Sequence, residues 1–121
     1  MSSFEPGDIA VYKVLYTDVN GIRRGKPRPI LIISQINSKG DFLAIAGSSR
    51  VDQWIGEPHV LVEPNDVING SLAHVTIFPA SKQILINPLF IGTKIGRLSQ
   101  HVLENLMRLV FALRVNDFYK A

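Results

Sequence analysis

The chain has 121 residues and no cysteine, so it contains neither a disulfide nor a thiolate metal site, and its redox compartment is not constrained. No apolar run is long enough to cross a bilayer, and Met1–Gly7 lacks the basic start and apolar segment of a signal peptide. We therefore expect a cytoplasmic protein. The length predicts one domain, residues 1–121, with a single hydrophobic core.

The patterns on which many active sites are built are also missing. The three histidines, at positions 59, 74 and 101, lack ligand-like spacing and have no accompanying carboxylate pair. There is no glycine fingerprint of a Rossmann or P-loop site. Composition leaves a Ser–His–Asp triad open, although Ser48-Ser49 lacks the elbow that exposes a nucleophile. We therefore expect no metal and no cofactor, and a site built from guanidinium and hydroxyl groups.

Positive charge is in slight excess and unevenly spread. The 13 Lys and Arg against 10 Asp and Glu give a net charge of +3, which permits nucleic acid or an acidic protein as a partner. Four of these cations, Arg23, Arg24, Lys26 and Arg28, lie within six positions. We interpret the residues after Asn20-Gly21, up to Lys26, as a long basic loop, and a merely solvated loop is an equally good interpretation.

The loop is expected to lead directly into a buried strand. Ile30–Ile33 is a continuous apolar run rich in β-branched residues, which predicts a strand buried on both faces. Pro27 and Pro29 favour extended backbone on either side of Arg28. Arg28 is therefore expected at a strand entrance on stiff backbone, which suits an anion-binding group.

Short apolar stretches separated by turn residues predict further strands. We expect strands at residues 9–15, 30–34, 41–46, 59–63, 72–78 and 84–86, and a last strand or extended connection over 89–95. Alternation in the third of these places Phe42 and Ala44 on one face, and Leu43 and Ile45 on the other. Residues 52–58 are expected to form a loop or bulge. This pattern predicts a mainly β fold, a small antiparallel barrel with a C-terminal helix.

The C-terminal helix is expected from Gln100, after Ser99 as N-cap, to about Arg114. Its apolar residues cover roughly 200° of the helix circumference. They are Val102, Leu103, Leu106, Met107, Leu109, Val110 and Leu113. A helix that packs against a single barrel needs an apolar face of only about 100°. The surplus predicts a subunit interface and hence a homodimer, and the alternative is a helix sunk deep in its own domain.

One reaction suited to such a site is RNA cleavage by the 2′-hydroxyl of the substrate. The protein then needs only to position the phosphate, neutralise charge and move protons. Arg28 can clamp the phosphate, and Ser48 and Ser49, at the end of a neighbouring strand, can hydrogen-bond a phosphate oxygen or the 2′-hydroxyl. Ser48-Ser49 is also ordinary turn chemistry.

An ordered set of motifs carries a resemblance that covers nearly the whole chain. In order they are PGDIAVY, a polar loop, RPILIIS, AIAGSS, SKQILI and IGRLS leading into the final helix. The set resembles the MazF/PemK (Kid) family, toxins of type II toxin–antitoxin systems. The resemblance implies an SH3-like barrel of the CcdB/PemK kind with a terminal helix, dimerising so that substrate lies across the subunit interface.

The same resemblance implies an activity and partners. The activity is a metal-independent, sequence-selective endoribonuclease (mRNA interferase) that acts on single-stranded RNA and leaves a 2′,3′-cyclic phosphate and a 5′-hydroxyl. The expected protein partner is a cognate antitoxin, whose acidic, partly disordered segment occupies the RNA groove. The RNA motif is expected to depend on residues 16–28 and 50–58, whose conformations propensity does not fix.

The family's site residues transfer only in part. The arginine before proline corresponds to Arg28, and the Thr/Ser at the strand end corresponds to Ser48. Where some members carry an Arg and an Asp, this chain has Ala73, His74 and Val75, so His74 becomes the candidate proton-transfer group or else a structural histidine. The expected catalytic residues are Arg28, Ser48 and His74, and the expected RNA-binding residues are Arg23, Arg24, Lys26, Ser49, Arg50 and Lys82.

Two other interpretations stay open. The chain could be a binding module that keeps the barrel and the RNA contact but has lost cleavage, for which the missing Arg and Asp are the main support. It could also be a small barrel that binds only an acidic protein partner.

Overall fold

The computed structural model describes residues 4–34 and 37–120, with residues 14–16, 26 and 113–120 described by their backbone alone. The strands are β1 (Asp8–Thr17), β2 (Arg23–Ile32), β3 (Phe42–Ala46), β4 (His59–Val62), β5 (Val67–Ile68), β6 (Thr76–Pro79), β7 (Gln83–Ile86) and β8 (Ile91–Leu98). The helices are α1 (Val51–Trp54) and α2 (Gln100–Lys120), and 3-10 turns cover Pro64–Asp66, Ala80–Lys82 and Pro88–Phe90. The fold is mainly β with a C-terminal helix, as predicted.

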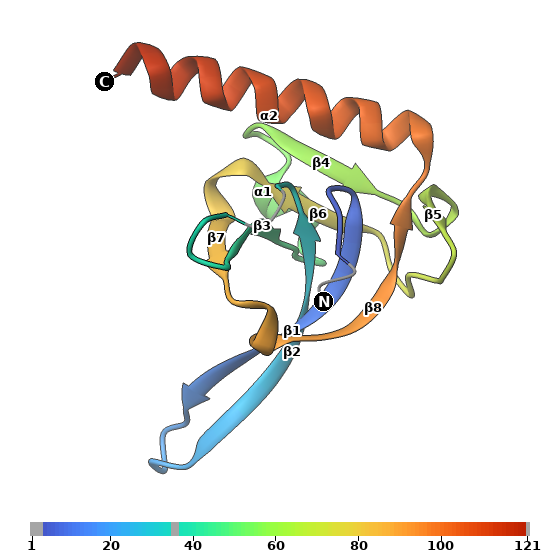
Figure 1. The fold of residues 1–121 in the computed structure, drawn as a ribbon. Helices are drawn as coiled ribbons and strands as arrows, with labels where there is room; N and C mark the ends of the chain where they lie inside the picture. Colours follow the sequence, from blue (N-terminus) through green and yellow to red (C-terminus); the bar gives the residue numbers. More distant parts are fainter. Residues whose placement is uncertain (1–3, 35–36, 121) are drawn as a thin grey trace.

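The strands form a six-stranded sheet in the order β5-β8-β1-β2-β3-β7 and a two-stranded sheet of β4 and β6, and all pairs are antiparallel. The segment after β3 joins the two sheets, because Ser48 forms a bridge with Ile77 of β6. In Figure 1 the long helix α2 lies across one end of the strands, next to β4.

The predicted two-sided burial of the second strand is confirmed. Ile30, Leu31, Ile32 and Ile33 are all buried, and alternate residues belong to two separate apolar clusters. Alternation in β3 is confirmed in the same way, since Phe42 and Ala44 lie in one cluster and Leu43 and Ile45 in the other. Strands β2 and β3 are therefore held in place by apolar packing on both of their faces.

Helix α2 covers the cluster that contains Leu31. Val102 and Leu106 are buried against it, whereas Met107 is 40% exposed and Phe111 is 71% exposed. The helix therefore keeps an apolar face outside its own domain, and the side chain of Leu113 lies outside the described residues. It is also longer than expected, because it continues past Arg114 to Lys120. No helix in the described ranges is both long enough and apolar enough to span a membrane.

The prediction of a long basic loop up to Lys26 is wrong, because the residues from Arg23 onward are paired with β1. Thr17 pairs with Arg23, and the ladder continues without interruption to Ile9 and Leu31. A tight turn makes this possible. The Asp18 carboxylate accepts hydrogen bonds from the backbone N–H groups of Asn20 and Ile22, at 2.9 and 3.0 Å.

The outer part of this hairpin projects from the body of the protein. Strand β1 pairs with β8 only as far as Tyr12, and β2 pairs with β3 only from Ile30. Residues 13–27, here called the hairpin arm, therefore form a two-stranded ribbon that extends away from the other strands (Figure 1).

Two further expectations differ from the structure. Part of the segment expected as a loop at 52–58 is the short helix α1. The strand expected at 72–78 begins only at Thr76, because its partner β4 stops at Val62, before the 3-10 turn that Pro64 begins. Residues 72–75 therefore pair with none of the strands in the described part of the chain.

Candidate functional site

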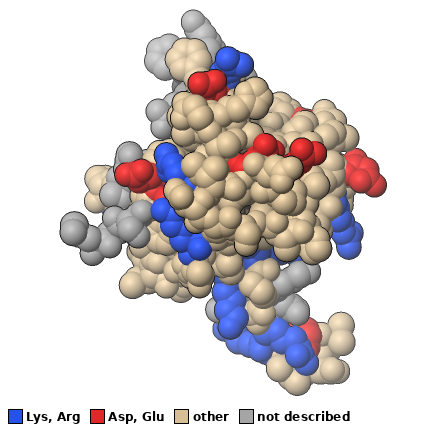
Figure 2. Space-filling model, turned by 90° about the vertical axis from the view of Figure 1, so that its right-hand side faces the viewer, with Lys and Arg blue, Asp and Glu red and all other residues tan. Residues whose placement is uncertain are grey.

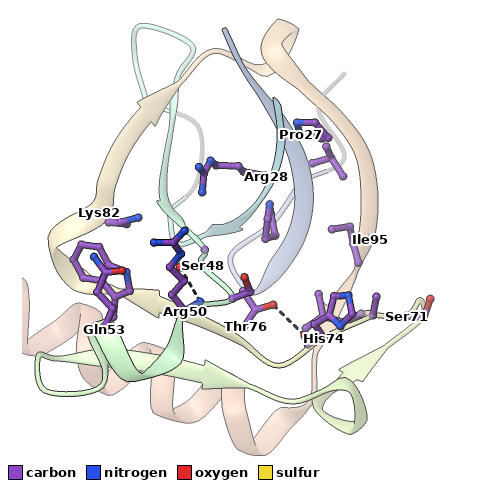
Figure 3. Close-up of a pocket in the computed structure, with 17 residues that line it drawn as sticks. Pro27, Arg28, Ser48, Arg50, Gln53, Ser71, His74, Thr76, Lys82 and Ile95 are labelled. Atoms are coloured by element: carbon purple, nitrogen blue, oxygen red, sulfur yellow. Dashed lines mark hydrogen bonds between the residues drawn. The ribbon is translucent and has the colours of Figure 1, made fainter. Parts of the chain in front are cut away.

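The residues expected to bind phosphate surround one hollow of about 790 Å³ (Figure 3). It is lined by the Pro27–Pro29 part of β2, the segment 47–50 that follows β3, the end of helix α1, residues 71–74, Thr76 and Lys82. Arg28 and Ser48 therefore line the same hollow although they come from different strands. A single anion in the hollow could therefore contact both side chains.

Arg28 reaches the hollow from a stretch of β2 that pairs on one side only. It is opposite Tyr12 of β1, whereas the pairing of β2 with β3 begins at Ile30. The two flanking prolines, Pro27 and Pro29, have no N–H to donate, and backbone contact on the second side begins where the Pro29 carbonyl accepts the Gly47 N–H at 2.8 Å. The guanidinium projects from the strand into the hollow (Figure 3).

Ser48 is held by backbone hydrogen bonds. Its N–H donates to the Ile77 carbonyl, and its own carbonyl accepts from the Ile77 N–H, both at 2.9 Å. The side chain is 8% exposed, and its Oγ accepts the backbone N–H of Arg50 at 3.1 Å. The hydroxyl proton then remains for donation to a ligand in the hollow.

Gly47 explains how closely this segment packs against β6. A Cβ at this position would lie 2.8 Å from both the Thr76 and the Phe78 side chains, and 3.1 Å from the ring of Pro29. The absence of a side chain therefore lets β2 and β6 approach each other. Thr76, 4% exposed, lines the hollow beside Ser48 as a result.

Two more cations line the hollow, Arg50 and Lys82. The ammonium of Lys82 lies 4.4 Å from the centroid of the Trp54 ring. Burial lowers the pKa of Lys82 below its ordinary value of 10.5; the positive charge of Arg28 lowers it further, and Glu57 acts in the opposite direction. Lys82 and Arg28 are thus close enough to repel each other, and an anion between them relieves that repulsion.

His74 lies toward the other end of the hollow from Lys82 (Figure 3). It does not lie on a strand, although a strand was expected at 72–78, because β6 begins only at Thr76. Instead its backbone carbonyl accepts the Thr76 hydroxyl at 3.1 Å. The imidazole is exposed, and it is the only one among the described residues around the hollow.

The other expected RNA-binding residues divide into two groups. Ser49 and Arg50 line the hollow, whereas Arg23 and Arg24 lie on the hairpin arm and do not. Figure 2 shows Lys and Arg side chains gathered on this arm. The side chain of Lys26 lies outside the described residues.

On the arm, Arg24 is partly neutralised. Its Nε donates to the Asp18 carboxylate at 2.6 Å, and this contact, with the backbone N–H groups of Ile22 and Asn20, holds the pKa of Asp18 below its usual value. Arg24 is therefore already paired in the free protein. Arg23 and Arg24 lie outside the hollow, and their contact with RNA stays a prediction.

Sequence reasoning gave no role to Gln53, Trp54 or Ser71, which also line the hollow. One signal was available for Trp54. It is the only tryptophan of the chain, and it stands four residues after Arg50 in a stretch without an apolar pattern.

No group of three or more His, Asp or Glu side chains able to hold a metal ion occurs in the part of the chain that the structure describes.

No family model matches the sequence, and no curated protein matches it.

Proposed function

We propose that this chain is a metal-independent endoribonuclease that cuts single-stranded RNA, and that it is the toxin of a type II toxin–antitoxin system of the MazF/PemK kind. One observation carries the proposal: Arg28 and Ser48, from separate strands, line one hollow together with Arg50 and Lys82. Three cations and a hydroxyl in one hollow suit a phosphodiester and the charge that builds on it during cleavage.

The proposed reaction uses the nucleophile of the substrate. The 2′-oxygen attacks the adjacent phosphorus, the bond from phosphorus to the 5′-oxygen breaks, and a 2′,3′-cyclic phosphate and a 5′-hydroxyl result. Arg28 and Arg50 bind the non-bridging oxygens, and Ser48 donates a hydrogen bond to one of them. His74 carries one of the two proton transfers, from the 2′-hydroxyl or to the 5′-oxygen, since an imidazole exchanges protons readily near neutral pH.

The finer architecture belongs to the same proposal. The two sheets form an SH3-like barrel of the CcdB/PemK kind, and two copies associate as a homodimer in the cytoplasm. The exposed Met107 and Phe111 on α2 support a subunit contact on that helix. An antitoxin inhibits the enzyme by laying an acidic, partly disordered segment over the cations of the hollow.

Substitution of Arg28 tests the proposal. Wild-type protein is expected to cut single-stranded RNA in the presence of EDTA, and Arg28→Ala is expected to lower the rate by about 10²- to 10³-fold, the usual effect of removing one preorganised charge-stabilising group. Gel assays give the rates. Lys39→Ala is the control, because it removes an exposed cation from the turn before β3 and should cut at the wild-type rate.

A second function, RNA binding without cleavage, is favoured by one feature. Some members of the MazF/PemK family carry an Arg and an Asp in this segment, where this chain has Ala73 and Val75 on either side of His74. A single imidazole is therefore available for the two proton transfers. Wild-type protein that binds RNA but leaves it intact, across varied sequences, would establish this function instead. If the protein binds an acidic peptide but does not bind RNA, it is a protein-docking module instead.

A further inference from the structure

Trp54 gives one end of the hollow a character unlike the rest. It is half-buried at the end of α1, and among the described residues that line the hollow it is the only Phe, Tyr or Trp. The lining elsewhere offers cations, hydroxyls, aliphatic side chains, the Gln53 amide and, toward the other end, the His74 imidazole. A nucleotide has a flat base attached to a charged phosphate, and an indole ring beside a cation cluster matches both parts.

The ammonium of Lys82 covers one face of the Trp54 ring. It lies 4.4 Å from the ring centroid, inside the hollow that both residues line. A phosphate is a stronger partner for an ammonium than an aromatic face is. An incoming phosphate near Arg28 therefore attracts Lys82 away from the indole and frees that face.

We propose that Trp54 is the stacking surface for one unpaired base of the bound RNA, and that Lys82 moves from the indole to the phosphate of the same strand. Gln53 precedes Trp54 on α1 and lines the hollow near Lys82 (Figure 3), where its amide can hydrogen-bond the edge of the stacked base. The site then prefers single-stranded RNA, since a base within a duplex is not free to stack on protein. This inference rests on the proposed occupation of the hollow by RNA.

The single tryptophan makes the test direct, because all indole fluorescence of the protein comes from Trp54. The probe is a 2′-O-methyl pentanucleotide of adenine and cytosine, which lacks the attacking hydroxyl and so cannot be cut. In five further probes one position at a time is made abasic. We expect the intact probe to quench the fluorescence, and one abasic position to remove most of the quenching.

Variants measured by calorimetry identify the contact. Trp54→Leu is expected to bind the intact probe about tenfold or more weakly, as is usual for a lost base stack, while its affinity for the probe abasic at the critical position equals that of wild type. Trp54→Phe should regain most of the affinity. Leu89→Ala, which shortens a side chain that is 90% exposed and lies outside the hollow, should bind as wild type does.

Lys82→Gln tests the exchange. It should keep the quenching, whereas the slope of log affinity against log salt should become shallower by about 0.7, the value for one phosphate contact on a single strand. An unchanged slope would overturn the role of Lys82.

The stacking role is overturned if no abasic position alters the quenching, or if Trp54→Leu binds the intact probe as tightly as wild type. Failure of the nuclease gives a different result: RNA with 2′-hydroxyls stays intact while the uncleavable probe still stacks. Wild-type protein that binds neither this probe nor single-stranded RNA of varied sequence would overturn both proposals.

Discussion

Single side chains in the hollow carry the proposed chemistry, and the pKa of one of them, Lys82, is lowered. Its pKa is lowered by burial and by Arg28, so the folded protein holds this proton less tightly than the unfolded chain does. The charge of Lys82 therefore destabilises the folded state below the folded pKa, and this penalty is relieved as pH rises through that pKa. A bound phosphate reverses the effect, because it favours the ammonium.

We therefore predict that affinity for the uncleavable pentanucleotide falls as pH rises through the lowered pKa of Lys82, at a pH where an ordinary lysine would still be charged. Adenine and cytosine do not titrate in that range, so the change reports the protein. Fluorescence titrations at successive pH values measure it. Lys82→Arg, which stays charged, should remove the decline, and a wild-type decline that persists in this variant would show that another group is responsible.

Away from the hollow, Asp8 joins the start of β1 to β8. It is completely buried, and its carboxylate accepts the Glu5 N–H at 2.8 Å and Arg97 Nη1 at 3.0 Å, and pairs with Lys94 Nζ at 3.1 Å. Because its partners would be left unpaired, loss of this carboxylate should be costly.

We predict that Asp8→Ala lowers the free energy of unfolding by about 2–4 kcal/mol, measured by urea denaturation. Asp52→Ala, at an exposed carboxylate on α1, is the control and should change it by less than about 0.5 kcal/mol. Equal stability of the two variants would mean that the network around Asp8 contributes nothing net.

Among the elements, helix α2 has both a buried and an exposed apolar face. Leu106 is completely buried, and its neighbour Met107 is 40% exposed. We predict that Leu106→Glu costs about 3–5 kcal/mol of unfolding free energy, because it buries a carboxylate without a partner. Thermal melting followed by circular dichroism measures this.

Met107→Glu is the matched control, with the same charge one position along the helix. It should leave the melting of the monomer almost unchanged and, if the exposed face is the proposed subunit contact, reduce the molar mass measured by light scattering. A Leu106→Glu variant that melts as wild type would show that the buried face has been assigned wrongly.

The elements that the sequence predicted are those with local signals. Ile30–Ile33 is apolar on both faces, and the alternation in β3 assigns each side chain to one of two clusters. The strand character of Arg23 came instead from pairing with Thr17, which a polar and basic stretch does not reveal. Leu72 lies in a stretch with strand composition, but β4 ends too early to pair with it.

The site was predicted in the same partial way. Ser48 follows a strand end that the sequence marks with a turn, and the expected order of the strands places it next to the strand of Arg28. Arg28 was expected at the entrance of that strand, which is wrong, because pairing with β1 extends β2 back to Arg23. Trp54 and Lys82 are far apart in the chain and belong to a short helix and a 3-10 turn. Only tertiary packing brings them together, and no periodicity predicts that contact.

At the scale of the whole molecule, two groups of cations bear on RNA binding. The hollow holds Arg28, Arg50 and Lys82, whereas the hairpin arm carries a second group in which Arg24 is already paired with Asp18. With a net charge of only +3, affinity for RNA depends on where the cations lie more than on their number. The hollow is the place where cations, hydroxyls and an aromatic ring come together.

The ends of the RNA fragments test the central claim most directly. Single-stranded RNA is incubated with the purified protein in EDTA, and the fragments are labelled with polynucleotide kinase without prior phosphatase treatment. Attack by the 2′-hydroxyl predicts that every new 5′ end accepts the label and that the new 3′ ends carry a cyclic phosphate. RNA that stays intact, or fragments that end in 5′-phosphate, would contradict a site in which Arg28 and Ser48 bind the phosphate for attack by its own ribose.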